Sequence, residues 1–174
     1  MSDAIPEVYL SPEQLRQRVQ ELGQQITRDY QGQAVLLVGI LTGALVFLAD
    51  LVRAIQLPVE IDTMALSSYG NASESSGVVR ILKDLNAPIE GKHVLIVEDI
   101  VDTGLTLHYL LETLHPRRPA SLKVCTLLDK EKGRAKSLTP DYIGFAVPDR
   151  FVVGYGIDYA QRYRNLPYVA LMES

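Results

Sequence analysis

The chain has 174 residues, of which 47% are hydrophobic and 22% are charged, and its formal net charge is -4. These values exclude a disordered chain, and the length fits one globular domain spanning residues 1–174. The sequence pI of about 5.4 argues against a general nucleic-acid coat, which requires a basic surface. We therefore expect no nucleic acid among the partners of this protein.

Two short stretches bear on the cellular compartment. The single cysteine, Cys125, lies in the apolar run LKVCTLL, which favours a buried, unreactive thiol in a reducing environment. The opening residues, MSDAIPEVYL, contain no basic segment followed by a long apolar run, so no signal peptide is predicted. Both features predict a cytoplasmic protein.

Residues 34–52, AVLLVGILTGALVFLADLV, have the length and apolar character of a membrane span. Gly39, Thr42 and Gly43 interrupt this run, and Asp50 in hydrocarbon would cost roughly 3 kcal/mol. A buried strand, a tight turn and a packed helix explain the same residues better. We therefore expect no contact with a membrane.

The predicted elements begin with a helix. Ser11, Pro12 and Gln14 match a capping box with proline at the first helical position, and apolar residues at helical spacing continue to about Tyr30. Strands are predicted at 34–40, 58–67, 78–82, 93–97, 122–128, 142–147, 151–155 and 168–172, and further helices at 44–56 and 103–114. This alternation indicates an α/β fold with a mainly parallel sheet, in which ligands bind beyond the carboxyl ends of the strands.

The stretch EDIVDTGLTL follows one such strand end and combines a glycine turn with hydroxyl side chains. Gly104 permits backbone torsions that other residues resist, and the N–H groups that open a helix carry part of its dipole. Thr103 and Thr106 add hydroxyl donors, so the turn is predicted to hold a phosphate. It is not a Walker loop, because no Gly-Lys-Ser/Thr follows. For Asp-Thr-Gly alone, capping of the helix by Asp102 or Thr103 is the simpler interpretation.

Glu98 and Asp99 stand directly before this turn and change that interpretation. At ~4 Å and an effective dielectric of ~20, two like charges repel by ~4 kcal/mol, and a bound phosphate adds to the repulsion. Mg²⁺ would relieve it, because this ion prefers carboxylates together with substrate phosphates. The pattern predicts a ribose with a phosphate at one end and a metal ion at the other.

The stretch VLIVEDIVDTGLTL closely resembles the phosphoribosyl pyrophosphate (PRPP) signature of type I phosphoribosyltransferases. FAVPDRFVVGYGIDYAQRYRNLPYV, LLDK, LSSYG and LTGAL resemble segments of the purine branch, the hypoxanthine-guanine phosphoribosyltransferases. The resemblance implies a mainly parallel central sheet flanked by helices, a small hood subdomain and a flexible active-site loop. It also implies an Mg²⁺-dependent transferase that converts hypoxanthine or guanine plus PRPP to IMP or GMP plus pyrophosphate, as a homodimer or homotetramer.

The resemblance also assigns roles to individual positions. Asp102 would be the general acid or base at purine N7, and proton transfer of this kind is worth ~10²–10⁴ in rate. The implied PRPP and phosphate residues are Glu98, Asp99, Asp102, Thr103, Gly104, Leu105 and Thr106. The implied pyrophosphate residues are Leu41, Thr42, Gly43, Ser68, Tyr69 and Arg164. The implied purine-site residues are Lys130, Phe151, Val152 and Asp158, and the implied metal ligands are Glu98, Asp99 and Asp158.

Several of these positions have simpler interpretations. Lys130 in DKEKGR and Arg164 in QRYRN also fit solvated surface charges, and Phe151 fits a core aromatic residue. Residues 67–77, SSYGNASESSG, fit either a plain connection or a lid that excludes water from a reactive ribose. The apolar helix at 44–56 fits either a subunit interface or the core.

One position departs from the family pattern. The family usually has lysine or arginine between the leucine and glycine of its pyrophosphate loop, whereas this chain has Thr42. Family members hold this peptide bond in the cis form, and the sequence leaves the state of Leu41–Thr42 open.

Two other functions stay open at this point. One is a protein that has kept the fold but binds RNA and senses nucleotides, against which the acidic pI counts. The other is transfer to another base. Lys130 favours a 6-oxo purine over adenine, whereas the sequence does not separate xanthine from guanine.

Overall fold

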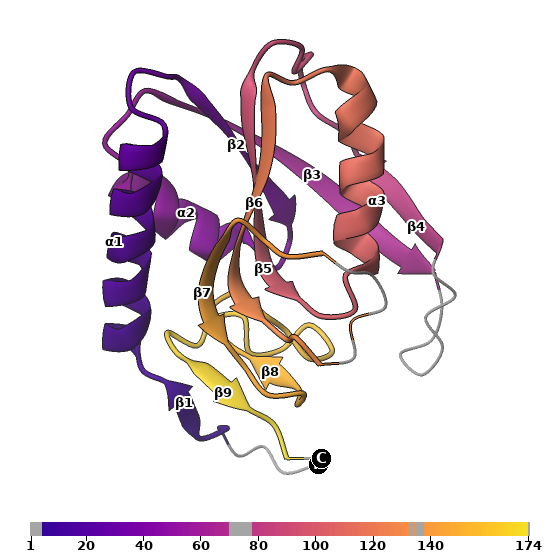
Figure 1. Ribbon diagram of the computed structural model, residues 1–174. Helices are drawn as coiled ribbons and strands as arrows, with labels where there is room; N and C mark the ends of the chain where they lie inside the picture. The colour runs from indigo at the N-terminus through magenta and orange to yellow at the C-terminus, as the bar shows by residue number, and fades with distance from the viewer. Residues whose placement is uncertain (1–4, 70–77, 133, 135–137, 174) are drawn as a thin grey trace.

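The computed structural model describes residues 5–69, 78–132, 134 and 138–173. Within these residues one sheet has the order β4-β3-β2-β5-β6-β7 and a smaller sheet has the order β1-β9-β8 (Figure 1). The strands are β1 (Val8–Leu10), β2 (Val35–Leu41), β3 (Val59–Tyr69), β4 (Val78–Lys83), β5 (His93–Val101), β6 (Ser121–Asp129), β7 (Tyr142–Ala146), β8 (Val152–Val153) and β9 (Val169–Leu171). The helices are α1 (Pro12–Asp29), α2 (Leu45–Ala54) and α3 (Leu105–Leu114), and a 3₁₀ helix spans His115–Arg117.

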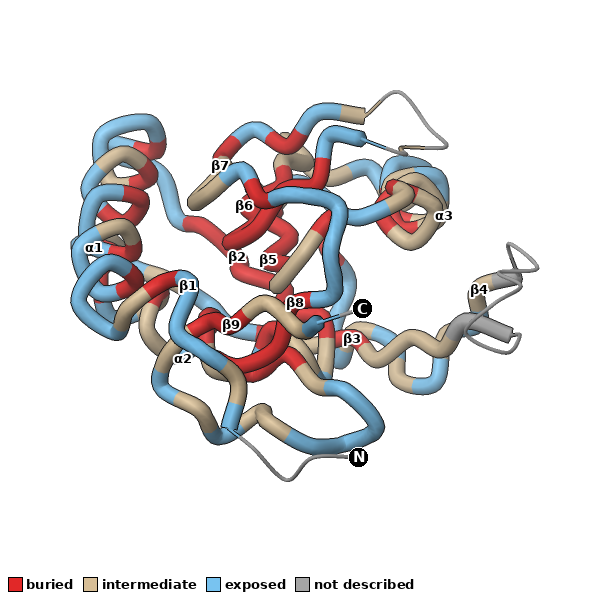
Figure 2. Tube along the Cα trace, turned by 90° about the horizontal axis from the view of Figure 1, so that it is seen from below, coloured by how far each residue is buried: buried red, intermediate tan, exposed pale blue. Residues whose placement is uncertain are grey.

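The larger sheet is parallel from β3 to β7, and β4 pairs antiparallel with β3 at its edge. Helices α1 and α2 pack on one face and α3 packs on the other, so the central strands are buried between them (Figure 2). Burial on both faces explains why β2, β5 and β6 are almost continuously apolar. The predicted α/β fold with a mainly parallel sheet is therefore confirmed.

Alternate residues of each strand enter two separate cores. Leu37 and Val97 pack with Phe47 of α2, whereas Ile96 packs with Met64 and Leu110 on the α3 side. The core thiol of Cys125 lies on the first of these faces and is fully buried. Burial raises its pKa well above the ordinary value, so the thiol is protonated and unreactive, as the sequence predicts.

The two N-terminal predictions are also confirmed. The backbone N–H of Gln14 donates to Ser11 Oγ at 3.1 Å, and the N–H of Ser11 donates to Gln14 Oε1 at 2.9 Å, which is the capping box. The apolar residues 34–52 form β2, a turn and α2 instead of a membrane span. Among the described residues, no helix combines the length and the apolar character needed to cross a bilayer.

Most element boundaries differ from the predictions by one or two residues, and three of the differences have a clear physical cause. β5 continues to Val101 instead of ending at Val97, because its parallel pairing with β6 extends as far as Asp129. α3 begins at Leu105 instead of residue 103, because Gly104 has φ 82 and forms its N-cap. β8 covers only two residues of the predicted 151–155, because φ is positive from Gly154 to Gly156. β1 was not predicted, and it pairs with β9 from the other end of the chain.

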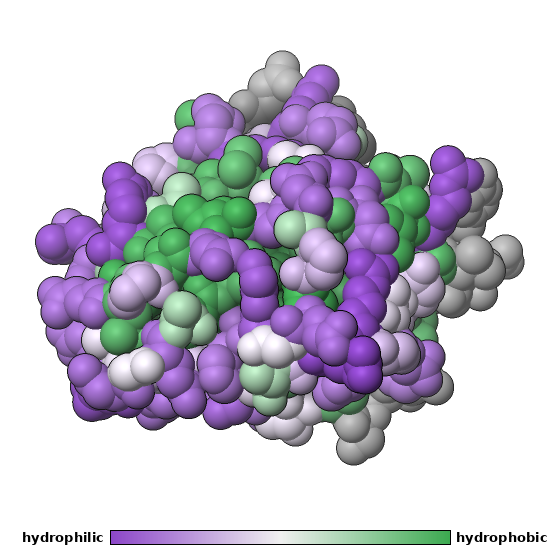
Figure 3. Space-filling model, turned by 90° about the horizontal axis from the view of Figure 1, so that it is seen from above, coloured by the Kyte–Doolittle hydropathy of each residue, from purple (hydrophilic) through white to green (hydrophobic). Residues whose placement is uncertain are grey.

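The small sheet β1-β9-β8 lies beyond the carboxyl ends of β5 and β6, where the resemblance places a hood subdomain (Figure 1). The opposite end of the molecule shows apolar surface between hydrophilic side chains (Figure 3), which is ordinary for a globular protein. The hood thus lies next to the strand ends, where ligands bind in folds of this class. Most of the loop expected to act as a lid, residues 70–77, lies outside the described residues.

Candidate active site

Glu98 and Asp99 are adjacent strand residues, so their side chains point to opposite faces of the sheet. Glu98 faces the start of α3, where it lines a pocket of about 100 Å³. Asp99 faces the β2–α2 loop, where its carboxylate lies directly over Gly43. The prediction that the strand ends before these two carboxylates is wrong, because β5 continues past them to Val101.

The turn between β5 and α3 has the predicted form of a phosphate cradle. Gly104 is left-handed at the N-cap of α3, and Thr103 Oγ1 accepts the N–H of Leu105 at 3.4 Å. Asp102 precedes the N-cap by two residues and its side chain is 54% exposed, so the helix-capping interpretation of Asp102 is wrong. The pocket beside this turn is lined by Glu98, Ile100, Val101, Asp102, Thr103, Gly104, Thr106 and Leu107. The N–H groups and hydroxyls of the turn can therefore bind a phosphate beside the carboxylate of Asp102.

Lys130 lies beside Asp102 because of the strand register. Val101 of β5 pairs with Asp129 of β6, and the N–H of Lys130 donates to the carbonyl of Val101 at 3.0 Å. Lys130 Nζ lies 3.5 Å from Asp102 Oδ2, and the lysine is only 7% exposed. A buried lysine paired with a carboxylate is not a solvated surface charge, so that interpretation of Lys130 is wrong.

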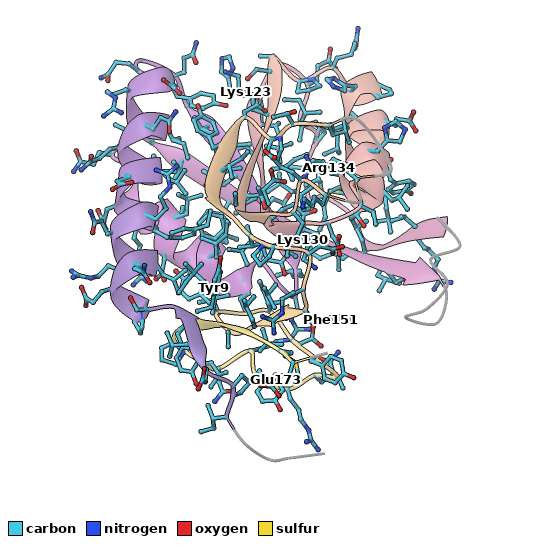
Figure 4. All side chains as sticks on the ribbon, turned by 60° about the horizontal axis from the view of Figure 1, so that its bottom comes forward. Tyr9, Lys123, Lys130, Arg134, Phe151 and Glu173 are labelled. Carbon is cyan, nitrogen blue, oxygen red and sulfur yellow. The ribbon has the colours of Figure 1, made fainter. Side chains whose placement is uncertain are left out.

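Phe151 completes this group from the far side. Lys130 Nζ is 6.0 Å from the centre of the Phe151 ring (Figure 4). Tyr159 packs edge-to-face against the same ring, and the two ring centres are 6.1 Å apart. Phe151 is 65% exposed, so it is not a core aromatic residue. Val152 is buried, and its backbone pairs with Leu171 of β9. An exposed ring beside a buried cation can stack on a planar base that carries a hydrogen-bond acceptor.

A second group surrounds Asp99. The peptide bond between Leu41 and Thr42 is cis, which answers the question that the sequence left open, and Thr42 is exposed. A Cβ at Gly43 would overlap the carboxylate of Asp99, so only glycine allows this approach. These contacts hold Asp99 against the β2–α2 loop (residues 42–44), which the resemblance assigns to pyrophosphate.

Arg164 and Asp158 lie on the same side as Asp99. Arg164 Nη2 is 3.3 Å from Asp158 Oδ1, and its Nη1 donates to the carbonyl of Gly156 at 2.7 Å. Burial raises the pKa of Asp99, while Arg164 lowers it and Asp158 raises it further. Because Arg164 is paired with Asp158 and bonded to the backbone of Gly156, it is not an isolated surface charge.

Burial dominates the electrostatics of the two strand carboxylates. It raises the pKa of Glu98 well above its usual range, and the neighbouring charge of Asp99 adds to the effect. Burial likewise raises the pKa of Asp99 to about 6, although backbone N–H donors and Arg164 oppose it. A bound cation would relieve this concentration of negative charge.

The predicted metal ligands do not form a cluster by themselves. Asp158 Oδ2 accepts the N–H of Gln161 at 2.9 Å, and Glu98 faces the other side of the sheet from Asp99. In the described ranges, no three histidine, cysteine, aspartate or glutamate side chains gather as a metal site. Carboxylate oxygens nevertheless suit Mg²⁺, which usually completes its shell with water and substrate phosphates.

Two predicted residues, Ser68 and Tyr69, end β3, where their backbones pair with Val79 and Val78. Their side chains lie outside what the structure describes, so their predicted contact with pyrophosphate is untested. Leu105 and Thr106 begin α3, as the phosphate cradle requires.

Arg134 is a residue that the sequence did not single out. It pairs with the buried carboxylate of Asp129, donates to the carbonyl of Leu138 at 2.5 Å, and lies 3.3 Å from the carbonyl of Lys130. Figure 4 shows Lys130 between Arg134 and Phe151. Arg134 therefore holds the backbone of Lys130 in place. The run DKEKGR contains no signal that separates this buried arginine from its solvated neighbours.

A larger pocket of about 640 Å³ lies between α1, α2 and the segment around Leu166, and it includes Arg164. The pocket is mostly apolar in its lining and contains none of Glu98, Asp99 and Asp102. The smaller pocket at the end of β5 is therefore the one that contains Glu98, Asp102 and the phosphate cradle.

Comparisons with known proteins agree with this geometry. Residues 9–160 match the family model described as a phosphoribosyl transferase domain. The chain is 50% identical to a Bacillus subtilis protein named hypoxanthine-guanine phosphoribosyltransferase, over 99% of this chain and 96% of that one. It is 52% identical to a Haemophilus influenzae protein named hypoxanthine phosphoribosyltransferase, over 94% of this chain and 93% of that one.

A solved structure gives the same result at the level of the fold. The crystal structure of a hypoxanthine-guanine phosphoribosyltransferase from Bacillus anthracis superposes with a TM-score of 0.93, at 48% identity, and covers 98% of this chain and 100% of that one. A family model that spans most of the chain, together with relatives at about half identity along its length, establishes that this protein belongs to the phosphoribosyltransferase family.

Proposed function

We propose that this protein is a purine salvage enzyme that converts hypoxanthine or guanine plus PRPP to IMP or GMP plus pyrophosphate. The observation that carries this proposal is the group formed by Asp102, Lys130 and Phe151. At the end of β5, a buried cation lies 3.5 Å from a carboxylate and 6.0 Å from the centre of an exposed aromatic ring. The names of the relatives support the same substrates.

The chemistry of a 6-oxo purine matches this group. Lys130 donates to the 6-oxo oxygen and disfavours the amino group of adenine, while Phe151 stacks on the ring. The purine N9 attacks C1 of the ribose, and the bond between C1 and the pyrophosphate oxygen breaks. Asp102 accepts the proton that leaves N7, so that charge does not accumulate on the base.

The rest of PRPP extends to both sides of β5. The 5′-phosphate binds the cradle from Thr103 to Thr106, where the helix dipole and the N–H groups favour an anion. Pyrophosphate lies toward the β2–α2 loop, where Arg164 supplies a positive charge. Thr42 offers only a hydroxyl and backbone groups at the position where the family usually has a cation.

The carboxylates Asp99 and Asp158, with Glu98 across the strand, are the residues that would hold Mg²⁺. The proximity of the Asp99 and Asp158 carboxylates on one side of the sheet supports this assignment, because Asp158 adds to the effect of burial in raising the pKa of Asp99. When bound, Mg²⁺ would neutralise the pyrophosphate as it leaves. Asp99 would also orient the ribose hydroxyls. We further propose a homodimer or homotetramer, and the cytoplasmic location stays a prediction.

The test is pyrophosphate release from PRPP with Mg²⁺ and each of hypoxanthine, guanine, xanthine and adenine. We expect turnover with hypoxanthine or guanine, little with adenine, and loss of turnover when EDTA replaces Mg²⁺. Fastest turnover with xanthine would support the transferase for another base. No turnover with any base, together with RNA binding, would replace the proposal with the nucleotide-sensing regulator.

A further inference from the structure

The chain makes an unusual turn between the hood and the site. Gly154, Tyr155 and Gly156 have φ of 97°, 51° and 95°, so three successive residues are left-handed. Glycine adopts this region freely, whereas tyrosine there costs roughly 1–2 kcal/mol. The surrounding structure must therefore hold Tyr155 in place.

The contacts of Tyr155 show what holds it. Its side chain is only 7% exposed, and its hydroxyl donates to Asp50 of α2. Its N–H donates to the carbonyl of Leu166 at 2.8 Å, and Arg53 pairs with the same Asp50. A single hydrogen bond thus joins the turn at 154–156 to the helix that directly follows the β2–α2 loop.

This turn positions two charged side chains on the pyrophosphate side of the site. A Cβ at Gly156 would lie 2.7 Å from the carbonyl oxygen of Gly43, so the turn packs directly on the β2–α2 loop. The N–H of Gly156 donates to the carbonyl of Arg164 at 3.0 Å, and its carbonyl accepts the guanidinium of Arg164 at 2.7 Å. Asp158 follows two residues later and pairs with Arg164. The position of both charged groups depends on where this turn sits.

We propose that Tyr155 and Asp50 are positioning residues that fix the separation between the β2–α2 loop and the pair Asp158–Arg164. This inference rests on the proposed function, because it assigns the pair to the PRPP half of the site. Loss of the hydrogen bond lets the turn shift relative to Gly43. PRPP then binds more weakly, while the purine pocket around Lys130 is unchanged.

The chain contains a matched control for this hydrogen bond. Tyr142 is also buried, and its hydroxyl donates to Asp29 at 2.7 Å. This bond joins the start of β7 to the end of α1, at the other end of β7 from Lys130 and Phe151. It has the same chemistry as the Tyr155–Asp50 bond but supports no residue of the site.

The experiment compares Tyr155→Phe with Tyr142→Phe. For each variant we would measure the Tm, kcat, the KM for PRPP and for hypoxanthine, and the Kd for PRPP by calorimetry with Mg²⁺. We expect both variants to lower Tm. Only Tyr155→Phe should raise the KM and Kd for PRPP, by about threefold to tenfold, which corresponds to one hydrogen bond. The KM for hypoxanthine should stay within about twofold in both, as expected for independent sites.

Asp50→Ala is the second test, since Asp50 lies on the helix surface. It should raise the Kd for PRPP as Tyr155→Phe does, and the double variant should add little to either single change, because both remove one interaction. A ratio of KM for PRPP to KM for hypoxanthine that is equal in Tyr155→Phe and Tyr142→Phe would overturn the inference. Additive effects of Tyr155→Phe and Asp50→Ala would overturn it as well. Absence of wild-type turnover with every base would instead reject the proposed function, and the calorimetric Kd would still test the pair.

Discussion

The two sides of β5 build their parts of the site in different ways. On the α3 side, the phosphate cradle comes from one continuous stretch, residues 98–106, and it remains an open pocket. On the other side, Asp99 meets the β2–α2 loop, and the turn at 154–156, which is far away in sequence, packs on the same loop. The packing is so close that Gly43 and Gly156 leave no room for a side chain. The first side is therefore expected to tolerate changes of shape, whereas the second depends on the positions of several elements at once.

The largest effect on activity is expected on the α3 side of β5. Asp102→Asn should lower kcat by about 10²–10⁴, because asparagine cannot accept the N7 proton. The free energy of unfolding should fall by only about 1 kcal/mol, because asparagine keeps an oxygen that can accept from Lys130 but loses the charge of the ion pair. Initial rates of pyrophosphate release and urea unfolding would measure the two quantities. Glu112→Gln, an exposed carboxylate on α3, is the control. A decrease in kcat of less than tenfold would contradict the role of Asp102.

Gly43→Ala tests the other side of β5, where Asp99 packs against the β2–α2 loop. The added methyl group would overlap the Asp99 carboxylate, so Asp99 or the loop must move. We expect a loss of about 1–3 kcal/mol in stability and a KM for PRPP raised by roughly tenfold, the equivalent of about 1.4 kcal/mol.

The control for this variant is Gly91→Ala. Gly91 has φ 74 and no neighbouring atom where a Cβ would lie, so its substitution strains the backbone without touching the site. It should lower Tm and leave the KM for PRPP unchanged. Equal KM values for the two alanine variants would show that the close packing at Gly43 has no bearing on PRPP binding.

Asp99→Asn should separate stability from function. Burial raises the pKa of Asp99 from 3.8 to about 6, so the folded state holds this proton more tightly than the unfolded state. The resulting stabilisation is present below pH 3.8 and is lost as the pH rises through 6. In the absence of Mg²⁺ and PRPP, the Asn variant should therefore be more stable than the wild type at pH 7.5, by about 1–3 kcal/mol.

Urea unfolding at several pH values between 4 and 8 would measure this difference. It should shrink toward pH 4, where Asp99 in the folded wild type is protonated. The variant should nevertheless bind PRPP less tightly with Mg²⁺ present. A stability difference that does not vary with pH would mean that Asp99 is not the group that titrates.

The smallest effect is expected at Thr42. Thr42→Lys restores the cation that the family usually carries, at an exposed position beside the cis peptide bond. Exposed ion pairs contribute about 0.2–1 kcal/mol, so the KM for PRPP should fall by no more than about fivefold. The decrease should weaken as salt is added. Thr42→Met supplies similar length without charge and should leave the KM unchanged; a similar gain from Met would assign the effect to packing.

Several features on both sides of β5 could be predicted from the sequence, because their signals are local. The capping box at Ser11, the path of residues 34–52 and the left-handed Gly104 all follow from neighbouring residues, and all are observed. The roles of Lys130 and Phe151 came from resemblance, and their pairing with Asp102 then follows from the β5–β6 register.

The features that the sequence did not predict depend on contacts between distant segments. The charged residues after Val97 predict the end of a strand, whereas β5 continues to pair with β6 as far as Val101. The opposite directions of Glu98 and Asp99 follow once that strand is extended. β1 depends on a partner at the far end of the chain, and no local pattern marks the burial of Arg134 or the conformation of Tyr155.

The buried thiol of Cys125 gives the protein a built-in reporter. It is the only cysteine in the sequence, it lies between β5 and β7 in the sheet, and it is fully buried. A thiol-specific chromogenic reagent can react with it only when this part of the sheet opens, so the labelling rate measures the free energy of that opening. Ligands that bind the folded state slow the labelling in proportion to their saturation. Substrate affinities can thus be measured without turnover, in every variant that leaves Cys125 in place.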